Sequence, residues 1–144
     1  MIRSVVATVV LIAGISAVAA QQDPIKARQE LMKSNSAQAK IGAAMAKGEA
    51  PFDLAKAKVI FTTLDANAGK LKTLWPAGSD KGDTKASSKI WADMAGFNAD
   101  LAKFESLAKA AETPVTDLAS FKTQFSAVGK VCGDCHQTYR LKKS

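Results

Sequence analysis

The chain has 144 residues and is basic, because 20 lysines and arginines outnumber 13 aspartates and glutamates and leave a formal net charge of +7 at pH 7. Two cysteines are too few for a disulfide framework. Sparse glycine and proline, together with abundant alanine and lysine, favour helices, and the length suits one domain with one core.

The first twenty residues form a segment of their own. Arg3 gives a positive start, an apolar run follows, and small side chains lead up to Ala20. This is the pattern of a secretory signal peptide that is cleaved at or just before Ala20. A membrane anchor is the alternative, but the run is short for a span of about 20 residues and no basic cluster follows it. We therefore expect residues 1–20 to be removed and residues 21–144 to form one exported domain without stable membrane insertion.

Two helices are predicted in the first half of this domain. One runs from about Pro24 to Lys47, with Asp23 as its N-cap and Gly48 as its stop signal. The next runs from about Phe52 to Trp75, where apolar residues recur at intervals of three to five, and Pro76 ends it.

Two further helices follow a polar, glycine-containing loop. One is expected from Ser87 or Ser88 to about Glu112, and the last from about Asp117 to Lys142. Four amphipathic helices with short links predict an all-α, antiparallel four-helix bundle with helices roughly 36 Å long. Its core would be rich in small side chains, which pack closely or leave room for a large group. The alanines assigned to this core are Ala39, Ala43, Ala46, Ala68, Ala95 and Ala102.

The motif C-x-x-C-H near the C-terminus holds both cysteines and the only histidine of the chain. This spacing is the attachment pattern of c-type haem. On a helix, residues three and four apart share a face, so Cys132, Cys135 and His136 point the same way. The two thiols can then bond to the haem vinyl groups while the imidazole reaches the iron. The motif predicts one haem c that is covalently bound through Cys132 and Cys135.

Three other interpretations of the cysteine pair remain open. A thioredoxin-like redox site expects a strand–helix–strand context early in the domain. A structural zinc site needs four protein ligands, and the motif supplies three. A plain disulfide at a helix end is the third. The helical context, the predicted export and the single histidine all favour haem.

A C-terminal attachment site on a four-helix bundle resembles the class II c-type cytochromes, the family of cytochrome c′ and cytochrome c-556. Class I relatives carry the motif near the N-terminus. The resemblance covers essentially all of the mature chain, and it implies a haem protein that transforms no substrate and is not an enzyme. Its most specific stretches are "CGDCHQTYR", "IKARQELMK", "AKGEAPFD" and "KIWADMAGF".

The resemblance places the second axial position of the iron at Met32, one turn after Arg28. In the cytochrome c-556 branch this residue is a methionine bound to iron, whereas in cytochrome c′ it is usually apolar and the iron is five-coordinate. The stretch "LMKSNSAQAKIGAAMAKGEAPFD" is more similar to the c-556 branch. We therefore expect His136 and Met32 as iron ligands, with core filling as the alternative for Met32.

The resemblance also implies roles for two arginines. Arg28 matches an arginine that pairs with a haem propionate, and the alternative is a solvated charge. Arg140 matches an arginine near the proximal histidine, where it would tune the iron, or it is simply an exposed charge. Trp75, Trp91 and Phe97 either line the haem pocket or belong to an ordinary core.

These features predict a periplasmic electron-transfer protein with His/Met ligation. The alternative is a five-coordinate cytochrome c′-like protein that binds nitric oxide or carbon monoxide, and a haem-free dithiol protein is a third hypothesis. Lysines and arginines near the motif would steer an acidic redox partner, or form only a solvated helix end. This basic rim consists of Lys130, Arg140, Lys142 and Lys143. A nucleic-acid role has no motif to support it, and both a monomer and a homodimer are compatible with the sequence.

Overall fold

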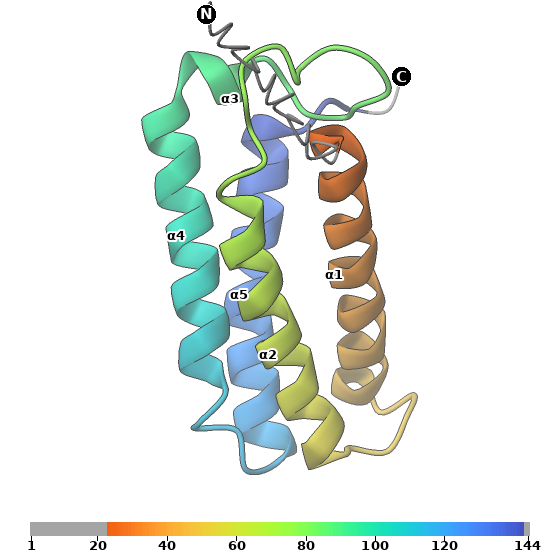
Figure 1. The fold of residues 1–144 in the computed structure, drawn as a ribbon. Coiled ribbons are helices and arrows are strands. Elements are labelled where there is room, and N and C mark those ends of the chain that lie inside the picture. The colour runs from red at the N-terminus through yellow and green to blue at the C-terminus, as the bar shows by residue number, and fades with distance from the viewer. Residues whose placement is uncertain (1–22, 143–144) are drawn as a thin grey trace, which may run out of the picture.

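The computed structural model describes residues 23–142, and the predicted signal peptide of residues 1–20 lies outside the described residues. Four long helices lie side by side and run alternately down and up, with one short helix at the top of α4 (Figure 1). The helices are α1 (Pro24–Lys47), α2 (Leu54–Leu71), α3 (Lys89–Ala92), α4 (Met94–Ala111) and α5 (Leu118–Tyr139). The predicted all-α, antiparallel four-helix bundle is confirmed.

Helix α1 has the predicted bounds because local signals fix both of its ends. Asp23 Oδ1 accepts a hydrogen bond from Ile25 N at 2.9 Å, as an N-cap does. Gly48 follows the last turn with a φ of 78°, and its N–H donates back to Met45 O at 3.2 Å. A residue with a Cβ would be strained at this left-handed position.

Helix α2 is shorter than predicted at both ends. It begins at Leu54 because Asp53 is its N-cap and accepts a hydrogen bond from Lys56 N at 3.0 Å. It ends at Leu71, four residues before the predicted end. Pro76 disfavours the helical conformation in the residue before it, so the chain leaves the helix before reaching the proline.

The predicted third helix is broken into α3 and α4 at Asp93, whose φ of −134° and ψ of 60° are not helical. The Asp93 side chain explains the break. Its Oδ1 caps α4 by accepting a hydrogen bond from Gly96 N at 3.0 Å, and its Oδ2 accepts one from the Tyr139 hydroxyl at 2.8 Å. A Cβ on Gly96 would lie 2.8 Å from the Tyr139 hydroxyl oxygen, so this close approach requires glycine.

Helix α5 ends at Tyr139 and not at Lys142 as predicted. The chain turns back there onto the loop that precedes α3. Two backbone hydrogen bonds of 2.9 and 2.8 Å join residues 139–141 to residues 85–87 in an antiparallel bridge. The extended tail therefore ties the end of α5 to a loop that is distant in sequence.

The buried apolar residues divide into two groups. The lower cluster, toward the bottom of Figure 1, consists of Met45, Ala57, Ile60, Phe61, Leu64, Ala68, Phe104, Ala108, Ala111, Val115, Phe121, Val128 and Val131. The upper cluster consists of Leu71, Ile90, Phe97, Leu101 and Tyr139. Helices α2, α4 and α5 contribute to both clusters. Within residues 23–142, no helix is long and apolar enough to cross a membrane.

The prediction of an alanine-rich core was wrong for three of its six residues. Of the six alanines assigned to it, Ala68 is buried, and Ala43 and Ala46 are half-buried. The exposed ones are Ala39, Ala95 and Ala102. Alanine buries little apolar area, so it suits either face of a helix and is a weak guide to the core.

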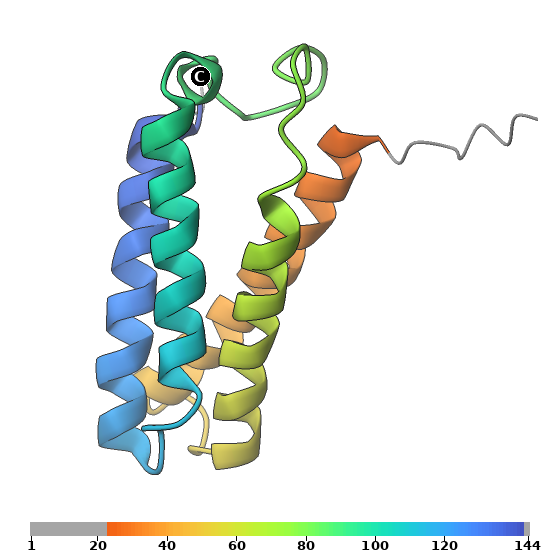
Figure 2. The same ribbon diagram turned by 60° about the vertical axis from the view of Figure 1, so that its left-hand side comes forward.

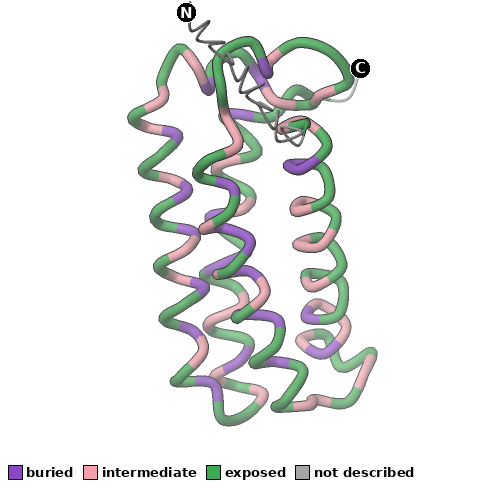
Figure 3. The backbone as a smooth tube through the Cα atoms, in the orientation of Figure 1, coloured by how far each residue is buried: buried purple, intermediate pink, exposed green. Residues whose placement is uncertain are grey.

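Helix α1 leans away from α5 toward the top of the bundle (Figure 2). The two helices approach closely lower down, where a Cβ on Gly42 would lie 2.7 Å from the Phe125 ring atom Cζ. Helix α1 has buried positions near both ends, but no residue from 29 to 41 is buried (Figure 3). The middle of α1 therefore lacks the close packing that the other long helices have.

Candidate haem site

The C-x-x-C-H motif occupies the last two turns of α5, so the predicted helical arrangement is confirmed. Cys132 is half-buried and packs against the lower cluster, whereas Cys135 is half-buried and packs against the upper cluster. His136 is exposed, and both thiols are free. The motif thus lies where the two apolar clusters meet, with its cysteines toward the core.

The surroundings of the motif keep its three side chains uncharged at neutral pH. Burial raises the pKa of the Cys132 thiol. Burial, followed by the negative charge of Asp100, raises the pKa of Cys135 to about 11. Partial desolvation of the ring, followed by the positive charge of Arg140, lowers the pKa of His136. Neutral imidazole is the form that binds iron, and neutral thiols pack as small apolar groups.

Met32 lies in the part of α1 that has no buried residue. Its side chain is half-buried and packs against the upper cluster, as Cys135 does. Just after it, a buried amide holds α1 onto α2, because Asn67 Nδ2 donates to Ser34 Oγ at 3.1 Å and to Asn35 Oδ1 at 2.7 Å. The structure therefore brings Met32 and Cys135 to the same apolar cluster from two different helices.

The other two methionines of the bundle lie in ordinary packing positions. Met45 is 2% exposed within the lower cluster, and Met94 packs against the upper cluster from the start of α4.

Arg28 is 4% exposed, so the alternative of a solvated surface charge is wrong. Its Nη1 donates to Leu74 O at 3.1 Å and to Ser79 Oγ at 2.9 Å, and its Nη2 donates to Ser79 O at 2.6 Å. The guanidinium carbon lies 4.4 Å from the centre of the Trp75 ring. Arg28 thus anchors the loop after α2 to α1. Its pairing with a propionate stays a prediction.

Aromatic rings surround the same loop. Trp75 packs edge-on against Phe97, with ring centres 4.6 Å apart, and against Trp91, with centres 6.1 Å apart. The Trp91 indole Nε1 donates to Pro76 O at 3.2 Å. The Trp75 indole Nε1 is buried and has no hydrogen-bond acceptor among residues 23–142. Both tryptophans and Phe97 belong to the upper cluster or pack against it.

Arg140 lies beside His136, as the resemblance implies. Both residues line a shallow surface groove of about 350 Å³, together with Gly133, Gln137, Leu141 and Lys142. Arg140 is exposed, and its positive charge helps to lower the pKa of His136. Whether this charge tunes the iron stays a prediction.

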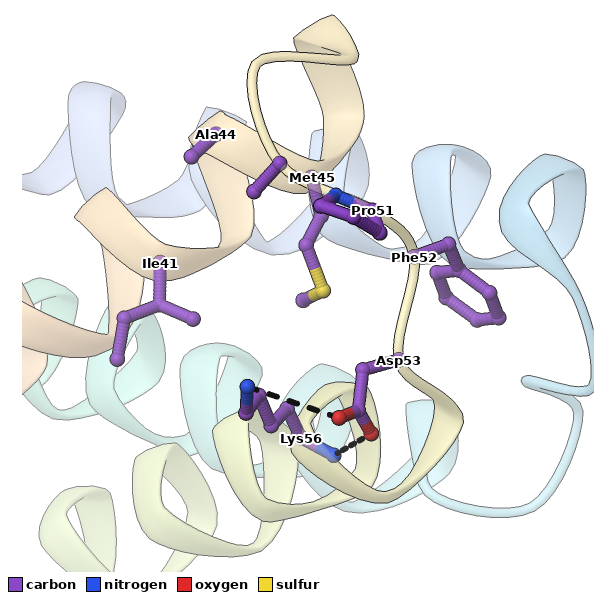
Figure 4. Close-up of a pocket in the computed structure, with 8 residues that line it drawn as sticks. Ile41, Ala44, Met45, Pro51, Phe52, Asp53 and Lys56 are labelled. Atoms are coloured by element: carbon purple, nitrogen blue, oxygen red, sulfur yellow. Dashed lines mark hydrogen bonds and ion pairs between the residues drawn. The ribbon is translucent and has the colours of Figure 1, made fainter.

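A second groove, of about 450 Å³, lies at the other end of the bundle between the end of α1 and the start of α2 (Figure 4). Met45 points into it, and the Asp53–Lys56 ion pair borders it. It contains none of the predicted site residues. Its lining consists of Ile41, Ala44, Met45, Ala50, Pro51, Phe52, Asp53 and Lys56.

Several residues that shape the site were not singled out from the sequence. Ser79 holds Arg28, and Asp93 with Gly96 holds Tyr139 one turn after the histidine. The only sequence signal for the second group is an aspartate three residues before a glycine inside a predicted helix. That pattern is compatible with an N-cap but says nothing about a tyrosine 46 residues away.

The residues present fit a covalently attached haem. Two uncharged thiols and one neutral imidazole share one helix, and apolar clusters lie on either side of the cysteines. The loop after α2 carries the Trp75 N–H donor without an acceptor in the described part of the chain, and the buried Arg28 of α1 is hydrogen-bonded to that loop. A four-helix bundle with this site at its C-terminal end defines a c-type cytochrome.

Comparison with known proteins identifies the family of c-type cytochromes to which the chain belongs. The family model described as Cytochrome C' matches residues 23–140, so the chain belongs to the cytochrome c′ family and carries one covalent haem c. It is 37% identical to a cytochrome c-556 from Rhodopseudomonas palustris over 99% of both chains. It is 40% identical to a cytochrome c′ from the same organism over 87% of this chain and 86% of the relative.

A solved structure of cytochrome c′ from Rhodopseudomonas palustris superimposes with a TM-score of 0.83 at 39% identity. The match covers 86% of this chain and 100% of that one. Relatives from both branches of the family are thus similar to this chain over most of its length.

Proposed function

We propose that this protein is an electron carrier of the periplasm, in which His136 and Met32 are the axial ligands of the iron. The haem supplies one-electron chemistry between ferric and ferrous iron. The chain's own residues hold this centre between two helices, exclude water from part of it, and keep the same ligands in both oxidation states. Little then has to reorganise when an electron is transferred.

The observation that carries this proposal is the position of Met32. It packs against the cluster that also receives Cys135, on the stretch of α1 where no residue is buried. Burial alone does not separate Met32 from Met94, which is also half-buried against the upper cluster. The difference is that Met32 lies one turn after the buried Arg28, on the stretch of α1 without buried residues, whereas Met94 comes from the start of α4. A half-buried thioether that packs against the same cluster as Cys135 is well placed for a ligand.

Absorption spectra of the purified holoprotein test the proposal directly. We expect low-spin spectra in both oxidation states, a sulfur-to-iron charge-transfer band in the ferric protein, and no rapid reaction of the ferrous protein with carbon monoxide. A high-spin ferric spectrum with ready carbon monoxide binding would contradict the carrier function.

That opposite result would favour the second candidate, a five-coordinate protein that binds nitric oxide or carbon monoxide. The observation in its favour is the 40% identity to a relative named cytochrome c′. In this case Met32 would pack against an open face of the iron without binding it.

Export remains part of the proposal. Its support is the signal-like pattern of residues 1–20 and the covalent haem, which is attached after translocation. The monomeric or homodimeric state stays a prediction, as does the absence of enzymatic activity.

A basic surface near the motif supports an acidic redox partner. The bridge between the tail and the loop before α3 brings Arg140 near Lys85, and Lys142 follows in the tail. These three exposed side chains form no ion pair with residues 23–142. Lys130, which was predicted to belong to the rim, is instead paired with Asp134 at 2.7 Å. Lys143 lies outside the described residues.

Reversing one of these charges is expected to change electron transfer according to the charge of the reagent. Lys85→Glu should slow oxidation of the ferrous protein by ferricyanide, an anion, by about threefold at low salt, and it should accelerate oxidation by the tris(1,10-phenanthroline)cobalt(III) cation. Stopped-flow traces at several salt concentrations measure both rates. Lys122→Glu, the same change at the opposite end of α5, is the control, and an equal effect there would refute steering by this surface.

A further inference from the structure

Trp75 and Trp91 are neighbours with opposite hydrogen-bond environments. The Trp91 indole N–H donates to a backbone carbonyl, whereas the Trp75 indole N–H is buried and has no acceptor within the part of the chain that the structure describes. Leaving a buried hydrogen-bond donor without an acceptor costs free energy, and buried donors in native proteins nearly always have a partner. The Trp75 N–H therefore calls for an acceptor that residues 23–142 do not supply.

A buried positive charge, that of Arg28, lies against the same Trp75 ring. Arg28 is buried, stacks over Trp75, and donates only to two carbonyls and one hydroxyl. No carboxylate of residues 23–142 lies within ion-pair distance of its guanidinium. Buried charges in proteins are normally paired with an opposite charge. The donor and the cation, which are independent observations, both indicate that an anionic acceptor binds at this loop.

The haem offers one kind of group that meets both needs. Its ring nitrogens are bound to iron, so its only strong hydrogen-bond acceptors are the two propionate carboxylates. Trp75 packs against the same upper cluster as Met32 and Cys135, two of the residues predicted to hold the haem. We propose that the Trp75 indole N–H donates a hydrogen bond to a haem propionate, beside the charge of Arg28.

This hydrogen bond gives Trp75 a role in orienting the cofactor. The cysteines fix the vinyl edge of the haem through covalent bonds, and Trp75 with Arg28 would fix the propionate edge at the loop after α2. The inference rests on the covalent haem and on the predicted role of Arg28. It does not depend on whether Met32 binds iron, so the spectra that test the carrier function leave it untouched.

The test compares Trp75→Phe with Trp91→Phe in the holoprotein. Phenylalanine keeps an aromatic ring at each position and removes only the N–H and part of the ring area. Resonance Raman spectroscopy reports the propionate bending mode, and electrochemistry reports the reduction potential. In Trp75→Phe we expect a shifted propionate mode and a lower potential, because a donor that offsets the carboxylate charge is lost. Trp91→Phe should leave the propionate mode unchanged.

A measurement on the protein without substitutions tests the proposal even if a variant fails to fold. In protein labelled with ¹⁵N at tryptophan, the Trp75 indole N–H should exchange with deuterium at least about tenfold more slowly than a free indole N–H. An unshifted propionate mode in Trp75→Phe would overturn the proposal, because it would mean that water or another group accepts the bond. A fast-exchanging indole N–H would overturn it as well.

Discussion

Replacing Met32 with alanine is expected to convert the ferric protein from a low-spin to a high-spin spectrum. Alanine cannot reach the iron, so one axial position would become vacant or take up water. The ferrous variant should bind carbon monoxide at least about a hundredfold more tightly than the original protein, because the gas no longer competes with a thioether. The reduction potential should fall, since methionine ligation raises it. Absorption spectroscopy with a carbon monoxide titration measures these effects.

Met94→Ala is the matched control for this experiment. Met94 is also half-buried and packs against the upper cluster, but it does so from α4. Its loss should reduce stability by a few kcal/mol at most, as for other core truncations, and leave the spin state unchanged. If Met32→Ala stays low-spin while Met94→Ala does not, the assignment of the ligand is wrong.

Replacing Gly42 with alanine is expected to destabilise the bundle by up to about 2 kcal/mol. The added Cβ would overlap the ring of Phe125, which is stacked on Phe121 with ring centres 5.2 Å apart and has little room to move. Overpacking of this kind costs about 1–3 kcal/mol, while alanine regains about 1 kcal/mol of helix propensity over glycine. Guanidinium unfolding of the holoprotein, followed by far-UV circular dichroism, measures the difference.

A second substitution tests whether this clash is the cause. Phe125→Leu shortens the side chain that the new Cβ would meet, so the double variant Gly42→Ala, Phe125→Leu should lose less stability than the sum of the two single changes. Additive losses would show that Gly42 matters for another reason.

Helix α1 shows what local sequence signals can predict. Asp23 before a proline and Gly48 after the last turn fix the ends of α1 through contacts within a few residues, and both ends were predicted correctly. The C-x-x-C-H motif was interpretable for the same reason, because its chemistry depends on spacing within one helical turn.

Features that depend on distant partners could not be predicted. The break at Asp93 exists because its carboxylate accepts the hydroxyl of Tyr139, and the tail leaves α5 to pair with residues 85–87. Each contact joins segments about 50 residues apart and leaves no periodic signal in either one. The sequence therefore predicted one continuous helix where α3 and α4 are separate, and it placed the end of the last helix beyond Tyr139.

The same limit applies to the site. The sequence identified Arg28 and Met32 only through a family resemblance, and it did not predict that Ser79 and the carbonyl of Leu74 hold the arginine. The orphan N–H of Trp75 became visible only when its surroundings could be compared with those of Trp91. Burial and hydrogen bonding are properties of the assembled bundle, so no single stretch of sequence contains them.

The division of the buried residues into two clusters has a consequence for how the protein unfolds. Cys132 packs with one cluster and Cys135 with the other, so the two thioether bonds join the haem to both. The haem would thus link two apolar clusters that both draw residues from α2, α4 and α5. We expect its attachment to make both clusters open and close as one cooperative unit.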